Sequence, residues 1–218
     1  MSEAPRSAVV IMLAALAVSL APAASASEGS APGHDGLYVR IGLGAGYVAG
    51  SASVAGESAS PTMKGASIAT ELAVGTSLAP GLVIGGGEYS MIVPSPTFTS
   101  RGVSGAAGAH HVSGLGPFVD YYFAPRGGLH AQAALLVGGA FVTAKDGRGS
   151  AAGFGFGAMI GLGYEVAISE RWSLGGVARL AAYRESLSSS DAFTGTDTSA
   201  KSTLAMLSPS CLLAVTLR

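Results

Sequence analysis

The sequence predicts an all-β protein: an eight-stranded antiparallel up-and-down transmembrane β-barrel preceded by a cleavable signal peptide. Three observations predict it. An apolar leader opens the chain, the composition is too poor in charge for a surface that faces water, and eight segments alternate between apolar and polar or small residues. Alternation with a period of two residues is typical of strands and not of helices.

The composition favours a protein whose surface meets something other than water. Of the 218 residues, 49% are hydrophobic and only 11% are charged, whereas an ordinary soluble domain is roughly a quarter charged. Beyond the leader, Gly, Ser or charged residues interrupt every apolar run before it reaches the length of a spanning helix. Strands in lipid satisfy all their backbone hydrogen bonds only in a closed barrel, so a barrel is the membrane structure that remains.

The leader has the organisation of a secretory signal. Arg6 precedes an apolar run over residues 8–20, and Ala24-Ser25-Ala26 follows it as a small-residue cleavage site. The run is shorter than the ~20 residues that a membrane-spanning helix needs. We therefore expect a signal peptide at 1–26, a short N-terminal segment at 27–35 and an outer-membrane β-barrel at 36–218.

The clearest alternation lies at the start of the predicted barrel. Between Leu37 and Ala49 the odd positions are apolar and mostly large, and the even positions are three glycines with Tyr38, Arg40 and Val48. Successive side chains of a strand point to opposite faces, so the large set faces outward and the small and polar set inward. Spanning strands need ~9–11 residues, and seven further segments are long enough: 66–78, 82–93, 114–123, 129–142, 153–168, 172–183 and 203–217.

The connections between these segments alternate in length. The long ones are 50–65, 94–113, 143–152 and 184–202, and the short ones are 79–81, 124–128 and 169–171. Short turns at one rim and long loops at the other are typical of bacterial outer-membrane barrels. We expect the turns to be periplasmic and the loops extracellular.

Aromatic residues at outward positions give a second criterion, because membrane barrels carry aromatic girdles at both interfaces. A soluble barrel that binds an apolar ligand would place its apolar set inside instead. The predicted membrane-interface aromatics are Tyr47, Tyr89, Tyr121, Phe123, Phe141, Phe154, Tyr164 and Trp172.

Charged residues fall at inward positions of the predicted strands. Isolated buried charges are costly, so these groups should form ion pairs, and we expect one cluster of Glu71, Glu88 and Arg179 and another of Arg40, Asp120 and Glu165. Paired carboxylates can also perform acid–base chemistry, but eight strands enclose a lumen that side chains fill, which favours polar packing. The predicted interior charged network is Arg40, Glu71, Glu88, Asp120, His130, Glu165 and Arg179.

Other features exclude some functions and leave one open. A net charge of −1 without a basic cluster argues against nucleic-acid binding, and Cys211, the only cysteine, cannot form an internal disulfide. We expect no cofactor and no metal. His110-His111 with Ser113 could form a hydrolytic site at the outer rim, or the two histidines could ligate a metal, but no recognisable motif surrounds them.

The chain resembles the eight-stranded outer-membrane barrel group that includes the OmpA membrane domain and OmpX. The resemblance covers about Gly36 to Arg218 and rests on architecture: the first strand, the turns at 79–81 and 124–128, and the inward Arg and Glu residues. The most distinctive segment, 116–130, resembles the strand–turn–strand hairpins of such barrels. The resemblance implies lipids and the barrel-assembly machinery as partners, and a monomer.

The expected function is therefore a non-enzymatic outer-membrane barrel with a structural or surface-interaction role. Two alternatives stay open at this point. One is a narrow channel for small solutes, and the other is a lipid-modifying hydrolase or acyltransferase that uses the His110-His111/Ser113 rim.

Overall fold

The computed structural model describes residues 36–54, 60–124, 127–143, 150–189 and 201–217. The predicted signal peptide and the 27–35 segment lie outside this part of the chain. Within the described residues, no helix is long and apolar enough to cross a membrane.

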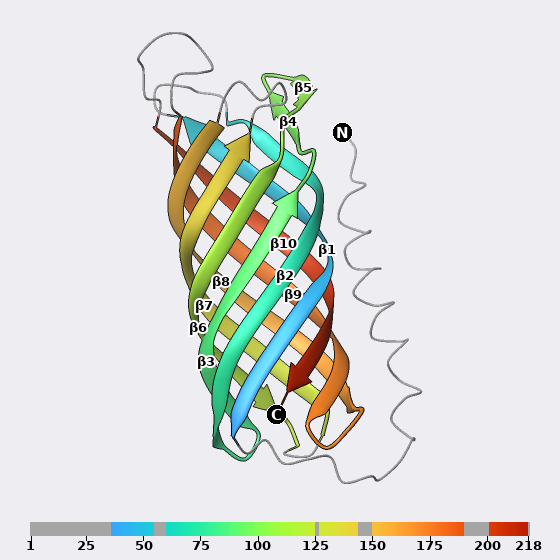
Figure 1. Ribbon diagram of the computed structural model, residues 1–218. Helices are drawn as coiled ribbons and strands as arrows, with labels where there is room; N and C mark the ends of the chain where they lie inside the picture. The colour runs from blue at the N-terminus through green and yellow to red at the C-terminus, as the bar shows by residue number, and fades with distance from the viewer. Residues whose placement is uncertain (1–35, 55–59, 125–126, 144–149, 190–200, 218) are drawn as a thin grey trace. The chain divides into compact units, whose positions relative to one another are not determined.

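Eight long strands form the body of the described part, and two short strands form a hairpin at one end of it (Figure 1). The long strands are β1 (Leu37–Val54), β2 (Thr62–Ala79), β3 (Leu82–Val93), β6 (His110–Tyr122), β7 (Leu129–Thr143), β8 (Ser150–Ala167), β9 (Trp172–Ser189) and β10 (Lys201–Leu217). The hairpin consists of β4 (Thr97–Ser100) and β5 (Val103–Ala106).

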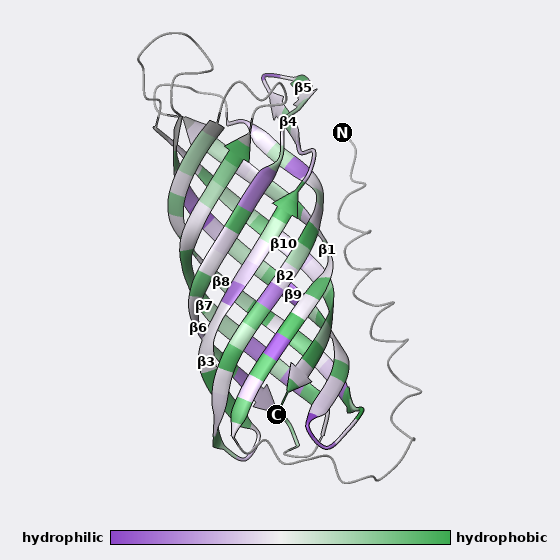
Figure 2. Cartoon of the chain, viewed as in Figure 1, coloured by the Kyte–Doolittle hydropathy of each residue, from purple (hydrophilic) through white to green (hydrophobic). Residues whose placement is uncertain are grey.

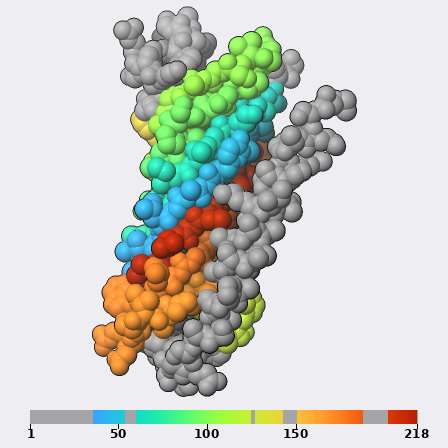
Figure 3. Space-filling view, turned by 90° about the vertical axis from the view of Figure 1, so that its right-hand side faces the viewer, coloured from blue at the N-terminus to red at the C-terminus, as the bar shows by residue number. Residues whose placement is uncertain are grey.

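The sheet closes on itself. Each long strand pairs antiparallel with its neighbours in the chain, with β3 pairing to β6 across the hairpin, and β1 pairs with both β2 and β10. Figure 3 shows β1 in blue beside β10 in red. Closure leaves no long strand with a free edge, and the prediction of an eight-stranded antiparallel barrel is confirmed.

The strand ends differ from the prediction at the long-loop rim. β1 continues to Val54 instead of Ala49, β2 begins at Thr62, and β6 begins at His110. The β4–β5 hairpin was not predicted. Its turn has Arg101 at φ 51° and Gly102 at φ 81°, the left-handed pair that favours two-residue hairpins. The added residues, 50–54, 62–65 and 110–113, mix small, polar and apolar residues without a regular alternation, so they lack the apolar contrast that marks a strand in sequence.

The outer surface of the barrel is apolar along most of its length. Figure 2 shows hydrophobic positions on every long strand. Large outward side chains such as Leu43, Ile160 and Leu213 are more than 60% exposed. In water this surface would be strongly unfavourable, whereas in a bilayer it contacts hydrocarbon, as in transmembrane barrels.

The orientation predicted for β3 is wrong. Glu88 is exposed on the outer face, and Tyr89 is fully buried inside. A run of three glycines, Gly85-Gly86-Gly87, removes the apolar contrast that would set the faces of this strand. Tyr89 packs over the inward Gly87, where an added Cβ would lie 2.8 Å from the tyrosine hydroxyl, so the missing side chain makes room for the ring.

Candidate functional site

The most concentrated chemistry inside the barrel surrounds Arg40, near the end that carries the short turns. Arg40 comes from the start of β1, and its side chain is 0% exposed. Asp120 comes from the end of β6, and Glu165 from the end of β8. Because the strands alternate in direction, these residues reach the same level of the lumen from different parts of the sequence.

Arg40 is the hub of this level. Its Nη2 donates to Asp120 Oδ2 at 2.6 Å and to Glu165 Oε1 at 3.0 Å. Thr216 Oγ1 donates to the same Glu165 oxygen at 2.7 Å, and Tyr38 donates its hydroxyl to Asp120 at 3.0 Å. Charge-assisted bonds of this kind are stronger than neutral ones.

His130 and Tyr122 complete the level around Arg40. His130 Nδ1 lies 2.7 Å from Asp120 Oδ1, and because a carboxylate only accepts, this contact places the proton on Nδ1. The imidazole stacks on Tyr122 with ring centroids 4.8 Å apart. Tyr122 in turn donates its hydroxyl to Glu165 at 3.3 Å. These contacts hold the imidazole of β7 against β6.

A second level begins at Glu71 and is continuous with the first. Glu71 Oε1 lies 3.6 Å from Arg40 Nη1, and Glu71 Oε2 lies 3.7 Å from Arg179 Nη1. Gln132 donates to Glu71 at 2.9 Å. The two predicted clusters are therefore one network, and Glu88 lies outside it on the opposite face of the wall. Tyr38, Tyr122 and Thr216 belong to it but were not predicted, because their inward positions carry no formal charge.

The other half of the lumen, toward the long connections, is mostly apolar. Besides Tyr183, the ionisable side chains buried there include His110 and Glu185. Within the described part of the chain, both ring nitrogens of His110 and Oε2 of Glu185 have no hydrogen-bond partner. The apolar side chains of this half are Val48, Met63, Met91, Val93, Val112, Leu136, Leu204 and Met206.

The predicted His110-His111/Ser113 site is divided by the barrel wall. His110 is buried in the lumen, whereas His111 is exposed on the outer face. Ser113 lies on the same face as His111, but its hydroxyl donates to Glu88 Oε1 at 2.9 Å. Among the described residues, no group of three or more His, Cys, Asp or Glu side chains is arranged to hold a metal ion.

The predicted interface aromatics other than Tyr89 lie at outward positions. Phe154 is 69% exposed, and Tyr164 is half-buried. Tyr121 and Phe123 pack edge to face, with centroids 5.7 Å apart. Exposed members of the set are Tyr47, Tyr121, Phe123, Phe141, Phe154 and Trp172.

Known proteins resemble this chain in architecture but not in sequence. No protein-family model and no curated protein matches the chain. The crystal structure of the outer membrane protein OprG from Pseudomonas aeruginosa is similar, with a TM-score of 0.53 at 11% identity over 85% of this chain and 97% of that one. The solid-state NMR structure of outer membrane protein AlkL gives a TM-score of 0.53 at 13% identity over 88% and 94%.

A weaker similarity, with a TM-score of 0.40 at 9% identity, is found with the outer membrane protease OmpT from Escherichia coli over 84% of this chain and 97% of that one. It is too low to carry any inference about catalysis. Similarities at these identities show the fold alone. Together with the closed sheet and the apolar outer face, they show that the chain has the fold of the eight-stranded outer-membrane β-barrel proteins.

Proposed function

We propose that the protein is a non-enzymatic structural barrel of the bacterial outer membrane, embedded in lipid as a monomer, with a closed lumen and its long connections outside the cell. The observation that carries the proposal is the complete burial of the Arg40 hub. Arg40, Glu71, Asp120, His130 and Glu165 all have side chains that are 0% exposed.

The hub connects strands from around the barrel. Its members come from β1, β2, β6, β7 and β8, and Thr216 adds β10. A solute that passed this level would have to separate ion pairs in a low-dielectric interior, and removing one member of such a pair costs several kcal/mol. These ion pairs and hydrogen bonds between strands support a role in stabilising the barrel wall.

The apolar half of the lumen supports the same role. Val48, Val93 and Leu204 are at most 1% exposed, and Leu136 is 2% exposed. A water-filled path would need polar side chains here, as in larger barrels with aqueous channels. Buried charged side chains in one half of the lumen and buried apolar side chains in the other therefore favour a closed barrel over a narrow channel.

The division of the histidines supports a non-enzymatic role. A hydrolytic serine needs a base within hydrogen-bond reach, at about 2.6–3.2 Å. The Ser113 hydroxyl donates to Glu88, His110 lies on the other side of the wall, and no hydrogen bond joins Ser113 to His111 within the described part of the chain. The predicted Ser–His pair is therefore not formed.

Conductance measurements on the refolded full chain test the proposal. We expect no steady conductance in a planar bilayer at voltages that leave the bilayer intact. Insertion is checked separately on a gel, where a folded barrel migrates differently before and after boiling. Discrete, steady current steps from protein that passes the gel test would contradict a closed lumen and favour the channel.

A further inference from the structure

Glu88 stands out because it places a carboxyl group on the outer wall. It is the seventh residue of the twelve in β3, and its strand neighbours are Leu72 on β2 and Leu115 on β6. Ionisable residues that face lipid in the middle of a strand are costly, and such residues mark functional sites. The rest of β3 gives no packing reason for an acidic residue here.

Polar groups lie directly beside Glu88 on the same face. Ser113 donates to Glu88 Oε1 at 2.9 Å. In the next row of the sheet, Thr70 and Ser90 share a hydrogen bond of 2.6 Å. The second carboxyl oxygen, Oε2, makes no hydrogen bond within the described part of the protein, so it is available to a ligand.

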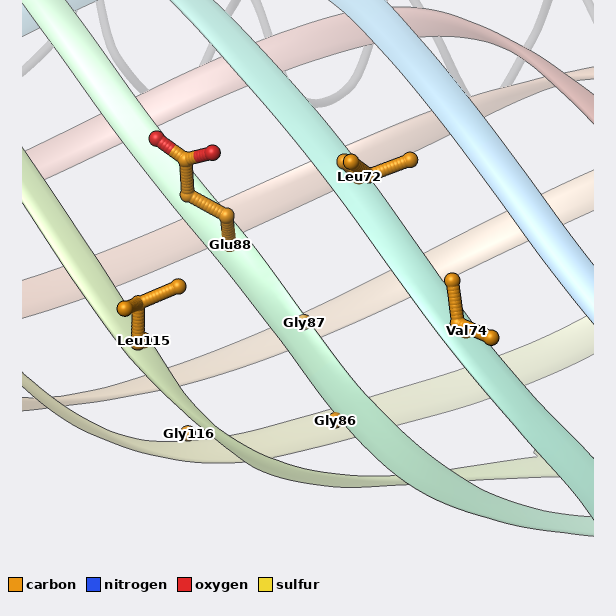
Figure 4. A pocket seen from close by; sticks show the side chains of 7 residues that line it. All are labelled: Leu72, Val74, Gly86, Gly87, Glu88, Leu115 and Gly116. Atoms are coloured by element: carbon orange, nitrogen blue, oxygen red, sulfur yellow. The ribbon is translucent and has the colours of Figure 1, made fainter.

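A shallow groove adjoins the carboxyl group (Figure 4). Its volume is about 410 Å³, and three glycines contribute to its floor. At Gly86 an added Cβ would have only the Gly116 carbonyl oxygen as a neighbour, at 4.0 Å, so the space above this residue is empty. The lining residues are Leu72, Val74, Gly86, Gly87, Glu88, Leu115 and Gly116.

This combination fits an apolar ligand with one hydrogen-bond donor. Binding sites for small molecules are mostly apolar, with a few polar groups that fix orientation, and have volumes of about 300–1,000 Å³. Leu72, Val74 and Leu115 provide the apolar walls, and Glu88 provides the acceptor. β3 has twelve residues, about the length of a spanning strand at ~9–11 residues. Glu88 is six residues from its first residue and five from its last, so a donor part-way along a hydrocarbon chain fits this position better than a headgroup at either interface.

We propose that the groove binds an acyl chain of a membrane lipid that carries a hydroxyl group part-way along its length, with Glu88 as the hydrogen-bond acceptor. This inference rests on the proposed function in one respect, that lipid surrounds this face. The chain lies against Leu72, Val74 and Leu115, and its hydroxyl donates to Glu88 Oε2.

The test uses the full chain refolded in lipid nanodiscs and observed by NMR through the backbone amides of Gly86, Gly87 and Gly116. The probes are a phospholipid with a 12-hydroxystearoyl chain and the same phospholipid with a stearoyl chain. We expect saturable shifts of these amides with the hydroxylated lipid only. Equal shifts with both lipids, or shifts with free methyl 12-hydroxystearate but not with the lipid, would overturn the proposal.

Variants separate the carboxyl group from the groove. Glu88→Leu should weaken the apparent affinity for the hydroxylated lipid at least tenfold, and Glu88→Gln should recover part of it because the amide oxygen still accepts. Gly86→Val should abolish the shifts at Gly87 and Gly116 by filling the groove. Thr70→Val is the matched control, since it removes a nearby hydroxyl that does not line the groove, and should leave the affinity unchanged.

Two further readouts make the outcomes distinct. Failure to insert, seen as no gel shift on boiling, would contradict the proposed function, whereas insertion without lipid-dependent shifts would contradict only the groove. If the protein is a dimer that Glu88→Leu converts to a monomer, the groove binds a second copy of the chain, and the proposal of a lipid ligand is overturned. Unchanged binding in Glu88→Leu would also overturn it.

Discussion

The two halves of the lumen are filled by side chains of different chemistry. Toward the short turns, Arg40 joins three carboxyl groups, two of them by hydrogen bonds. Toward the long connections, the lumen also contains a buried apolar cluster, and His110 and Glu185 retain atoms that have no hydrogen-bond partner among the described residues. Stability should therefore depend on polar complementarity in the first half and on apolar packing in the second. Removing a hydrogen-bonded polar group from the first half should lower stability strongly, whereas removing an unpartnered one from the second half should raise it.

Replacing the hub should have the largest effect. Arg40→Met keeps much of the side-chain volume but leaves Asp120, Glu165 and Glu71 without their shared cation. We expect the free energy of unfolding to fall by about 3–5 kcal/mol, as when one partner of a buried pair is removed. Urea unfolding in detergent micelles, followed by tryptophan fluorescence and gel mobility, measures this change.

Arg184→Met is the matched control for the hub, because Arg184 is an exposed arginine on the outer face of β9. It should lower the free energy of unfolding by no more than about 0.5 kcal/mol, and a rise would agree with the cost of a cation on the lipid face. Similar losses in both variants would show that the hub contributes no more than a surface arginine, and would remove the distinction between the two halves.

The sequence predicted the half with charges better than the half without them. Arg40, Asp120 and Glu165 contrast with their apolar neighbours along each strand, so their inward orientation follows from period-two alternation. In the other half, Val48, Met63 and Met91 are inward yet as apolar as outward residues. Both faces then look alike in sequence, and neither the apolar filling nor the isolation of His110 could be predicted.

The glycine run of β3 limited the prediction in a different way. Residues 85–87 have no side chains, and the flanking residues are mostly apolar on both faces, so the assignment of the faces depended mainly on Glu88. Because we assumed that the Glu88 carboxylate faces inward, Glu88 and Tyr89 were each assigned to the wrong face. The deciding contact, Tyr89 packed over Gly87, joins residues two apart on one strand, but it depends on lumen space that the other strands define.

A smaller effect comes from two tyrosine hydroxyls, one in each half. Tyr38→Phe removes the hydroxyl that donates to Asp120 at 3.0 Å, and hydrogen bonds to charged groups contribute about 1.5–3 kcal/mol. Tyr183→Phe removes a hydroxyl whose contact, to the Tyr89 carbonyl oxygen, is 3.4 Å long. We expect a loss of about 2 kcal/mol for Tyr38→Phe and at most about 0.5 kcal/mol for Tyr183→Phe. Chemical unfolding of the two variants side by side checks the ranking, and the reverse order would contradict it.

The smallest expected effect is a gain in stability from the apolar half. His110→Leu removes two buried ring nitrogens that have no hydrogen-bond partner in the part of the chain that the structure describes, and it adds an apolar side chain to a mostly apolar half of the lumen. Leaving a buried polar group unsatisfied costs about 1–3 kcal/mol, so we expect the free energy of unfolding to rise by about 1 kcal/mol. His111→Leu is the control. The side chain of His111 is exposed on the outer face, so its replacement removes no unsatisfied polar group from the lumen. A destabilised His110→Leu variant would mean that the histidine has a partner in the folded protein. The half of the lumen toward the long connections would then depend on polar complementarity, as the half toward the short turns does.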